Sequence, residues 1–184
     1  MTWTPEQCGQ FLDTVEGERL YPLFHVAAYY GLRRGELIGL TWADVDLATR
    51  RIHVRDDVKS DDSDRVITVD QGTADVLEAW RERQLFERLE WDTGWTDTGY
   101  CFTREDGRPV LHGWVTERFR TLAARAGLPP VTFHGLRHGS ASMLLAAGVD
   151  LKVVSQTMGH ATAAFTADVY VTVLEEMEIG RAHV

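Results

Sequence analysis

His134-Gly135-Leu136-Arg137-His138 is the stretch on which the interpretation of the whole chain depends. It follows the helix breaker Pro129-Pro130 and begins a run that lasts to about Ala147, just before Gly148, so a helix is predicted here. Side chains at positions i, i+3 and i+4 share one face of a helix, which groups two imidazoles and one guanidinium. Such hydrogen-bond donors suit the binding of a phosphate group.

The two histidines of this stretch also have the i, i+4 spacing of a zinc pair in an H-E-x-x-H helix. Gly135 stands where that motif has its glutamate, and no third ligand is evident in the sequence. The two cysteines, Cys8 and Cys101, have no motif spacing and indicate reduced thiols in a cytoplasmic protein. We therefore expect neither a metal nor a cofactor.

Length and composition are those of an ordinary globular domain. The 184 residues suffice for one sizeable core, and the apolar fraction is 44%. No apolar run approaches the roughly 18–20 residues of a membrane span, and the N-terminus has no signal-peptide pattern. The net charge of −9 argues against a generic nucleic-acid binder, which carries a basic excess. It leaves a local phosphate site open, because the charge at one site can differ from the net charge.

Helical spacing, capping residues and glycine stops predict a mainly helical chain. The expected helices span residues 5–15, 20–30, 35–40, 73–89, 113–126, 134–147, 150–158 and 165–170, with one more after 173. Residues 51–54 and 65–69 alternate polar and apolar side chains, which is typical of strands, and they flank a long acidic tip around Lys59. We interpret residues 41–46 as a turn. The expected fold class is α+β, mainly α with a small antiparallel β-hairpin or sheet.

Four further positions carry chemistry, but each also has an ordinary structural explanation. Arg33 and Glu36 lie among apolar residues, where a buried charge needs a partner, so they can form an internal ion pair. Lys59 can be a solvated lysine of the acidic tip, and Tyr170, flanked by two valines, can be a core tyrosine. Whether these residues have a chemical or only a structural role depends on whether they belong to one larger sequence pattern.

Taken in chain order, the motifs resemble the catalytic domain of the tyrosine recombinases, the phage-integrase family, over nearly the whole chain. Five segments of the sequence resemble the sequence motifs of this family. They are Gly31-Leu32-Arg33-Arg34-Gly35-Glu36-Leu37, Lys59 with Ser63-Asp64-Arg65-Val66-Ile67, the stretch from His134 to His138, Met158-Gly159-His160, and Thr166 with Tyr170. Each motif alone is weak, but together they make a specific signal. The resemblance implies six catalytic residues: Arg33, Lys59, His134, Arg137, His160 and Tyr170.

The reaction that this resemblance implies is phosphoryl transfer from DNA to a tyrosine and back. Tyr170 would attack a backbone phosphate, giving a 3′-phosphotyrosine and a free 5′-hydroxyl without ATP. Lys59 would protonate the leaving 5′-oxygen, and His134 would exchange a proton with the tyrosine.

The resemblance assigns the remaining residues to the phosphate and its support. Arg33 and Arg137 would hold phosphate oxygens with fixed, planar forks, which makes a metal unnecessary. His160 would hydrogen-bond a non-bridging oxygen. Glu36 would hold Arg33 by a charge-assisted pair, and His138 would buttress the site.

The family also implies partners: double-stranded DNA and other recombinase protomers in a DNA-bound tetramer, with no membrane. Its preceding DNA-binding domain has no counterpart in this sequence, so we expect residues 1–184 to be a single catalytic domain that is monomeric in isolation. The expected function is site-specific DNA recombination or integration. Two alternatives remain: a type IB topoisomerase-like enzyme, and a non-catalytic DNA-binding or assembly module that keeps the fold.

Overall fold

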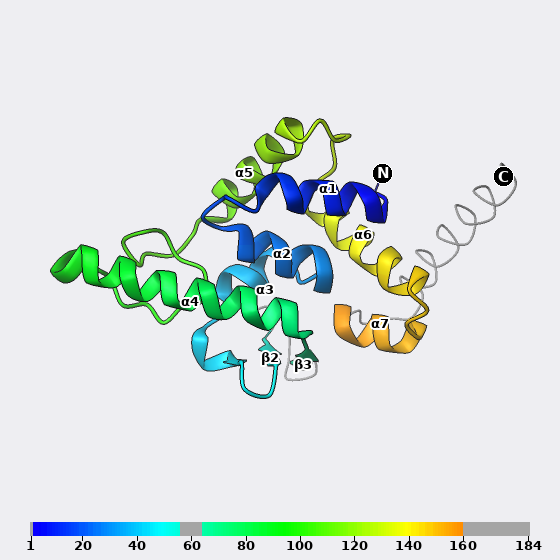
Figure 1. Ribbon diagram of the computed structural model, residues 1–184. Helices are drawn as coiled ribbons and strands as arrows, with labels where there is room; N and C mark the ends of the chain where they lie inside the picture. Colours follow the sequence, from blue (N-terminus) through cyan, green and yellow to red (C-terminus); the bar gives the residue numbers. More distant parts are fainter. Residues whose placement is uncertain (1, 56–63, 160–184) are drawn as a thin grey trace, which may run out of the picture.

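The computed structural model of the protein describes residues 2–55 and 64–159 (Figure 1). It is mainly helical with one small antiparallel sheet, which confirms the predicted fold class. The elements are α1 (Pro5–Val15), α2 (Tyr21–Tyr30), α3 (Arg34–Gly39), η1 (Trp42–Asp44), β1 (Val45–Asp46), β2 (Arg51–Val54), β3 (Arg65–Thr68), α4 (Gln71–Trp91), η3 (Asp92–Gly94), α5 (His112–Arg125), α6 (Phe133–Ala146) and α7 (Leu151–Met158). The helices expected after residue 160 lie outside the described residues.

Local signals account for the helix boundaries. Thr4 and Gln7 form the predicted capping box of α1, with the Gln7 amide donating to Thr4 Oγ1 over 3.3 Å and the Thr4 amide donating to Gln7 Oε1 over 3.0 Å. Gly31 ends α2 with a left-handed φ of 59°, which a residue without Cβ adopts at little cost. The Asp70 carboxylate caps α4 by accepting from the Thr73 amide.

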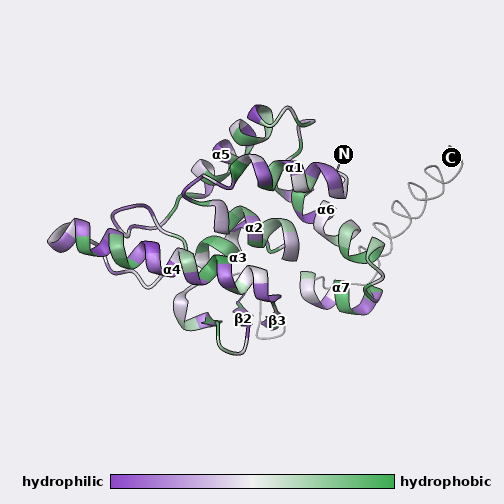
Figure 2. Ribbon diagram, in the orientation of Figure 1, coloured by the Kyte–Doolittle hydropathy of each residue, from purple (hydrophilic) through white to green (hydrophobic). Residues whose placement is uncertain are grey.

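The core is built around α2, which contacts α1, α4 and α6. Its side chains are almost all buried, as their apolar and aromatic character predicts, and Figure 2 shows hydrophobic residues concentrated on α2 and α3 near the centre of the fold. Phe24 of α2 meets Phe11 of α1 and Phe119 of α5, and Phe119 in turn meets Phe133 at the start of α6. These rings fix the beginning of α6, which carries the histidines, against the rest of the core.

The sheet has one strand more than predicted. It runs β1-β2-β3, all antiparallel, with Val45 opposite Ile52 and Ile52 opposite Ile67. The expectation of a turn over residues 41–46 was therefore wrong for its last two residues. A two-residue strand is too short to show polar–apolar alternation, so no periodic signal marks it.

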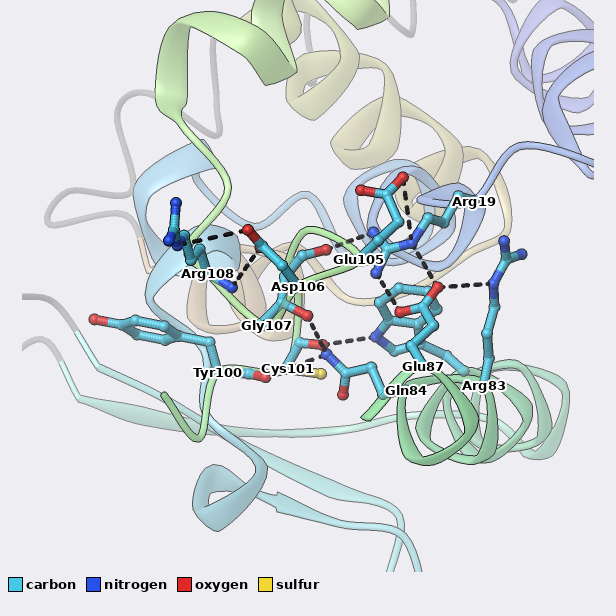
Figure 3. A network of polar contacts seen from close by, with 12 residues as sticks. Arg19, Arg83, Gln84, Glu87, Tyr100, Cys101, Glu105, Asp106, Gly107 and Arg108 are labelled. Atoms are coloured by element: carbon cyan, nitrogen blue, oxygen red, sulfur yellow. Dashed lines mark hydrogen bonds and ion pairs between the residues drawn. The ribbon is translucent and has the colours of Figure 1, made fainter. Parts of the chain in front are cut away.

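The C-terminal half of α4 departs from a simple apolar stripe. It extends away from the other helices, and Leu85 and Leu89 are 55% and 76% exposed. The inward positions are instead taken by Gln84 and Glu87, which belong to the polar network of Figure 3. Arg19 makes a forked contact with Glu87, with nitrogen–oxygen distances of 2.6 and 2.8 Å. The same guanidinium donates to the Thr103 carbonyl and lies over the Trp80 ring, so this network ties the loop before α5 to α4.

Within the described residues, no helix combines the length and the apolar character that crossing a membrane requires.

Candidate active site

The structure describes five of the eight residues predicted for the site. Arg33 and Glu36 lie at the start of α3, and the other three occupy the first turns of α6. Thr132 caps α6 by accepting from the Gly135 amide over 3.0 Å, which fixes where this helix begins. Lys59, His160 and Tyr170 lie outside the described residues.

The Glu36 carboxylate is the hub of the site. It accepts from Arg33 Nη1 over 2.8 Å and from the Arg33 backbone amide over 2.7 Å, so the predicted Arg33–Glu36 pair is present. It also accepts a forked pair from Arg65, from Nη1 over 2.9 Å and from Nη2 over 3.0 Å. The Glu36 side chain is only 3% exposed, so its charge is matched by cations within the protein.

Arg65 was not predicted as a site residue, although its sequence held a signal. It is the first residue of β3, and in a strand it shares a face with Ile67, two positions on. Ile67 is buried, and Arg65 is held in the same interior with its side chain 11% exposed. An arginine on the buried face of a strand needs an anion, and Glu36 is that anion.

The pKa of Glu36 reflects two opposed influences. Burial favours the neutral acid, but the hydrogen bonds and positive charges of Arg65, together with those of Arg33, outweigh it and lower the pKa below its usual value. Glu36 therefore remains a carboxylate at neutral pH and holds two guanidinium groups in fixed orientation.

Three arginines from three different segments meet the C-terminal end of α7. Arg65 Nε donates to the Thr157 carbonyl over 2.8 Å, Arg137 Nη2 donates to the Met158 carbonyl, and Arg33 Nη2 donates to the Gly159 carbonyl over 2.8 Å. The last carbonyls of a helix have no partner within it and carry partial negative charge. The end of α7, immediately before His160, is thus drawn to the arginine cluster.

Arg137 and Arg33 differ in accessibility. Arg137 is 4% exposed and also donates from Nη1 to the Gly31 carbonyl over 2.5 Å. Burial, followed by the nearby Arg33 charge, lowers the pKa of Arg137 to about 10, so it remains a cation at neutral pH. The Arg33 side chain is 40% exposed. The cluster therefore presents Arg33 to solvent, with Arg137 behind it.

The His134 and His138 rings lie edge to face, 4.5 Å apart between centroids. The pKa of His134 is lowered by burial and by the charges of Arg137 and Arg33, and the pKa of His138 is lowered by burial and by His134. The helix thus places both imidazoles beside the arginines, as its spacing predicts. Within residues 2–55 and 64–159, no third histidine, cysteine or acidic side chain joins them to make a metal-binding group.

We expect His134 to titrate below pH 6.5, because burial disfavours the charged imidazole and because protonation would place a further positive charge beside Arg137 and Arg33. A lowered folded-state pKa means that its contribution to stability is complete above 6.5 and declines as the pH falls below that value. Titration of the imidazole signals by NMR measures this directly. Arg33→Gln removes one cation and should raise the His134 pKa; a His134 pKa at or above 6.5 in the unmodified protein would contradict the expectation.

The comparisons with known proteins agree with this architecture. The chain is 28% identical over 201 residues to a tyrosine recombinase XerC-like protein of Caldanaerobacter subterraneus subsp. tengcongensis, covering 96% of the chain and 51% of that relative. It is 32% identical over 149 residues to tyrosine recombinase XerC of Mycobacterium tuberculosis, covering 74% of the chain and 44% of that relative. The crystal structure of XerA recombinase superposes with a TM-score of 0.81 at 29% identity, covering 98% of the chain and 65% of that structure.

The chain therefore spans about half the length of the curated relatives that it matches. The model of the phage integrase family matches residues 2–177, which is nearly the whole sequence. The arginine cluster thus lies in a domain of known type, and the protein belongs to the phage integrase family.

Proposed function

We propose that residues 1–184 form the catalytic domain of a tyrosine recombinase, which cleaves and rejoins DNA for site-specific recombination or integration. The observation that carries this proposal is the convergence of Arg33, Arg137 and His134 beside the end of α7, directly before His160 in the sequence. The similarity to recombinases XerC and XerA supports the same activity. These names favour a recombinase over the topoisomerase-like and non-catalytic alternatives.

In the proposed reaction, the Tyr170 oxygen attacks the phosphorus of a DNA phosphodiester. A bond forms between that oxygen and phosphorus, and the bond from phosphorus to the 5′-oxygen breaks. Lys59 gives a proton to the departing 5′-oxygen, and neutral His134 accepts the tyrosine proton. A 5′-hydroxyl then attacks the phosphotyrosine in the reverse sense, so no external energy source is needed.

Arg33 and Arg137 supply the electrostatic stabilisation in this proposal. Negative charge builds on the non-bridging phosphate oxygens in the transition state, and fixed guanidinium groups stabilise it without reorganising. His160 would add a hydrogen bond to one oxygen. Glu36 keeps Arg33 in place, and His138 packs against His134. No metal or cofactor takes part in these steps.

The partners follow from the same proposal: double-stranded DNA and further recombinase protomers in a DNA-bound tetramer. We propose a cytoplasmic location because the DNA substrate lies there, and a monomeric state for this chain without DNA. Low ionic strength is the right condition for detecting DNA binding, since the contacts of arginine and lysine with phosphate weaken as salt rises.

The test is covalent capture of DNA. The protein is incubated with a library of duplexes that carry a nick near a randomised central sequence, so that the short fragment diffuses away after cleavage and traps the adduct. We expect a detergent-resistant protein–DNA adduct from the unmodified chain and none from Tyr170→Phe. Tyr29→Phe, at an exposed tyrosine of α2, is the matched control and should form adduct normally. Equal adduct from Tyr170→Phe and the unmodified chain would overturn the nucleophile assignment.

A further inference from the structure

We propose that Arg65 is a positioning residue for DNA cleavage, which holds Glu36, and through it Arg33, in register with the end of α7. This inference rests on the function proposed above. It concerns a residue outside the six catalytic positions, and it follows from the contacts of the Arg65 side chain.

All three guanidinium nitrogens of Arg65 are occupied by protein groups. Nη1 and Nη2 donate to the two Glu36 oxygens, and Nε donates to the Thr157 carbonyl. The side chain is 11% exposed, against 40% for Arg33. The Arg65 side chain therefore serves contacts within the protein, whereas the Arg33 guanidinium is accessible to solvent.

Arg65 joins three segments that hold different predicted roles. Glu36 orients Arg33 through both the backbone amide and the guanidinium. The Thr157 carbonyl belongs to the last turn of α7, which leads in sequence to His160. Arg65 itself begins β3, the strand that follows Lys59. The Arg65 side chain thus connects β3, which follows Lys59 in the sequence, both to Glu36 and to the last turn of α7, which precedes His160.

The geometry requires an arginine at this position. A planar fork can pair with both carboxylate oxygens while its Nε donates in a third direction, but an ammonium group is a single point donor. The chain also leaves room for the fork, because a Cβ at Gly159 would lie 2.6 Å from Arg65 Nη1. Gly159 is in the left-handed region at a φ of 63°, so glycine serves both the helix end and the approach of the guanidinium.

Removing Arg65 changes the chemistry of Glu36 as well as its position. Burial raises the pKa of this carboxyl, and Arg65 provides the strongest opposing hydrogen bonds and charge. With Arg33 as the remaining partner, Glu36 would accept a proton at a higher pH. Its hold on Arg33 would then weaken in mildly acidic solution, which shifts the acid limb of the cleavage profile upward in pH.

The test compares Arg65→Gln and Arg65→Lys with the unmodified chain in single-turnover adduct formation between pH 5 and 8. The control is Arg51→Gln, which removes the same charge from an exposed position on the neighbouring strand β2. A displacement of about 1 Å can cost on the order of 100-fold in rate, so we expect both Arg65 variants to be slower by at least roughly tenfold. DNA affinity should change little in the two Arg65 variants, since all three guanidinium nitrogens of Arg65 donate to protein groups. Both the rate and the DNA affinity of Arg51→Gln should be normal.

Two readouts separate positioning from a loss of fold. Arg65→Lys should keep its circular dichroism spectrum yet remain slow, and Arg65→Gln should move the acid limb upward and raise the Glu36 pKa measured by ¹³C NMR. Unmodified rates and pH profiles in both Arg65 variants would overturn the inference while leaving the proposed function intact. Absence of adduct from the unmodified chain would overturn the proposed function and the catalytic part of the inference. An unchanged Glu36 pKa in Arg65→Gln would overturn the coupling itself.

Discussion

Glu36→Gln is expected to lower the free energy of unfolding by about 3–5 kcal/mol, the usual cost of removing one partner from a buried ion pair. Glutamine keeps the shape of the side chain but leaves Arg33 and Arg65 without their carboxylate, beside the buried cation Arg137. The amide nitrogen of glutamine would also point a donor at a guanidinium that can only donate. Urea unfolding at pH 7 measures the loss.

A double variant isolates the electrostatic part of this effect. Glu36→Gln combined with Arg65→Gln removes one of the unmatched cations, so it should be more stable than the sum of the two single losses predicts, by about 1–3 kcal/mol. The control is Glu117→Gln, at an exposed pair with Arg120, which should cost at most about 1 kcal/mol. Simple additivity in the double variant would contradict the hub role of Glu36.

The loss of stability caused by Glu36→Gln alone should depend on pH. The pKa of Glu36 is lowered in the folded protein, so its stabilisation is complete above its ordinary value of 4.5 and is lost as the pH falls. The stability difference between the unmodified chain and Glu36→Gln should therefore begin to shrink as the pH falls below 4.5, and it should vanish only below the lowered pKa of Glu36, where both folded proteins carry a neutral side chain at position 36.

The helices could be predicted because their signals are local. The capping box at Thr4, the left-handed Gly31 and the cap at Asp70 each act within a few residues, and the predicted boundaries fall close to the observed ones. The two-residue strand β1 could not be predicted, since its pairing with β2 is the whole reason that it exists. A pattern of two residues does not reveal that another segment of the chain pairs with them.

In the candidate site, too, the local contacts could be predicted from the sequence and the long-range contacts could not. The i, i+3 pairing of Arg33 with Glu36 and the shared face of His134 and Arg137 follow from helical spacing, and both were predicted. The contact of Arg65 with Thr157 joins residues 92 positions apart, and no periodic pattern encodes it. The catalytic roles of all six residues stay predictions, and Lys59, His160 and Tyr170 also lie outside the described part of the chain.

The end of α7 also suggests how the site meets DNA. Arg33 and Arg137 donate to the Gly159 and Met158 carbonyls, which carry partial negative charge of the kind that phosphate oxygens carry in full. A bound phosphate would share or replace these acceptors. On the proposed function, the two arginines would exchange these weakly negative carbonyls for a stronger anion, and the carbonyl contacts already hold their orientation without DNA.

Arg137→Lys is expected to reduce adduct formation by about 1,000-fold or more, the scale at which one arginine acts on a phosphoryl transition state. Lysine preserves the positive charge but cannot hold the Gly31 and Met158 carbonyls and a phosphate oxygen with one planar group. Lysine is the better probe than alanine, because alanine would leave both buried carbonyls without a donor and so confound catalysis with stability.

The measurement is single-turnover adduct formation at saturating protein, with circular dichroism and urea unfolding on the same preparations. Arg120→Lys is the matched control, since this exposed arginine of α5 pairs only with Glu117 among the contacts described and lies outside the cluster. Normal cleavage by Arg137→Lys would mean that charge alone suffices at this position and that the fork has no catalytic part. Slow cleavage with an equal loss of folded protein would assign Arg137 to the fold, whereas slow cleavage by a folded protein would assign it to the transition state, as its place behind Arg33 predicts.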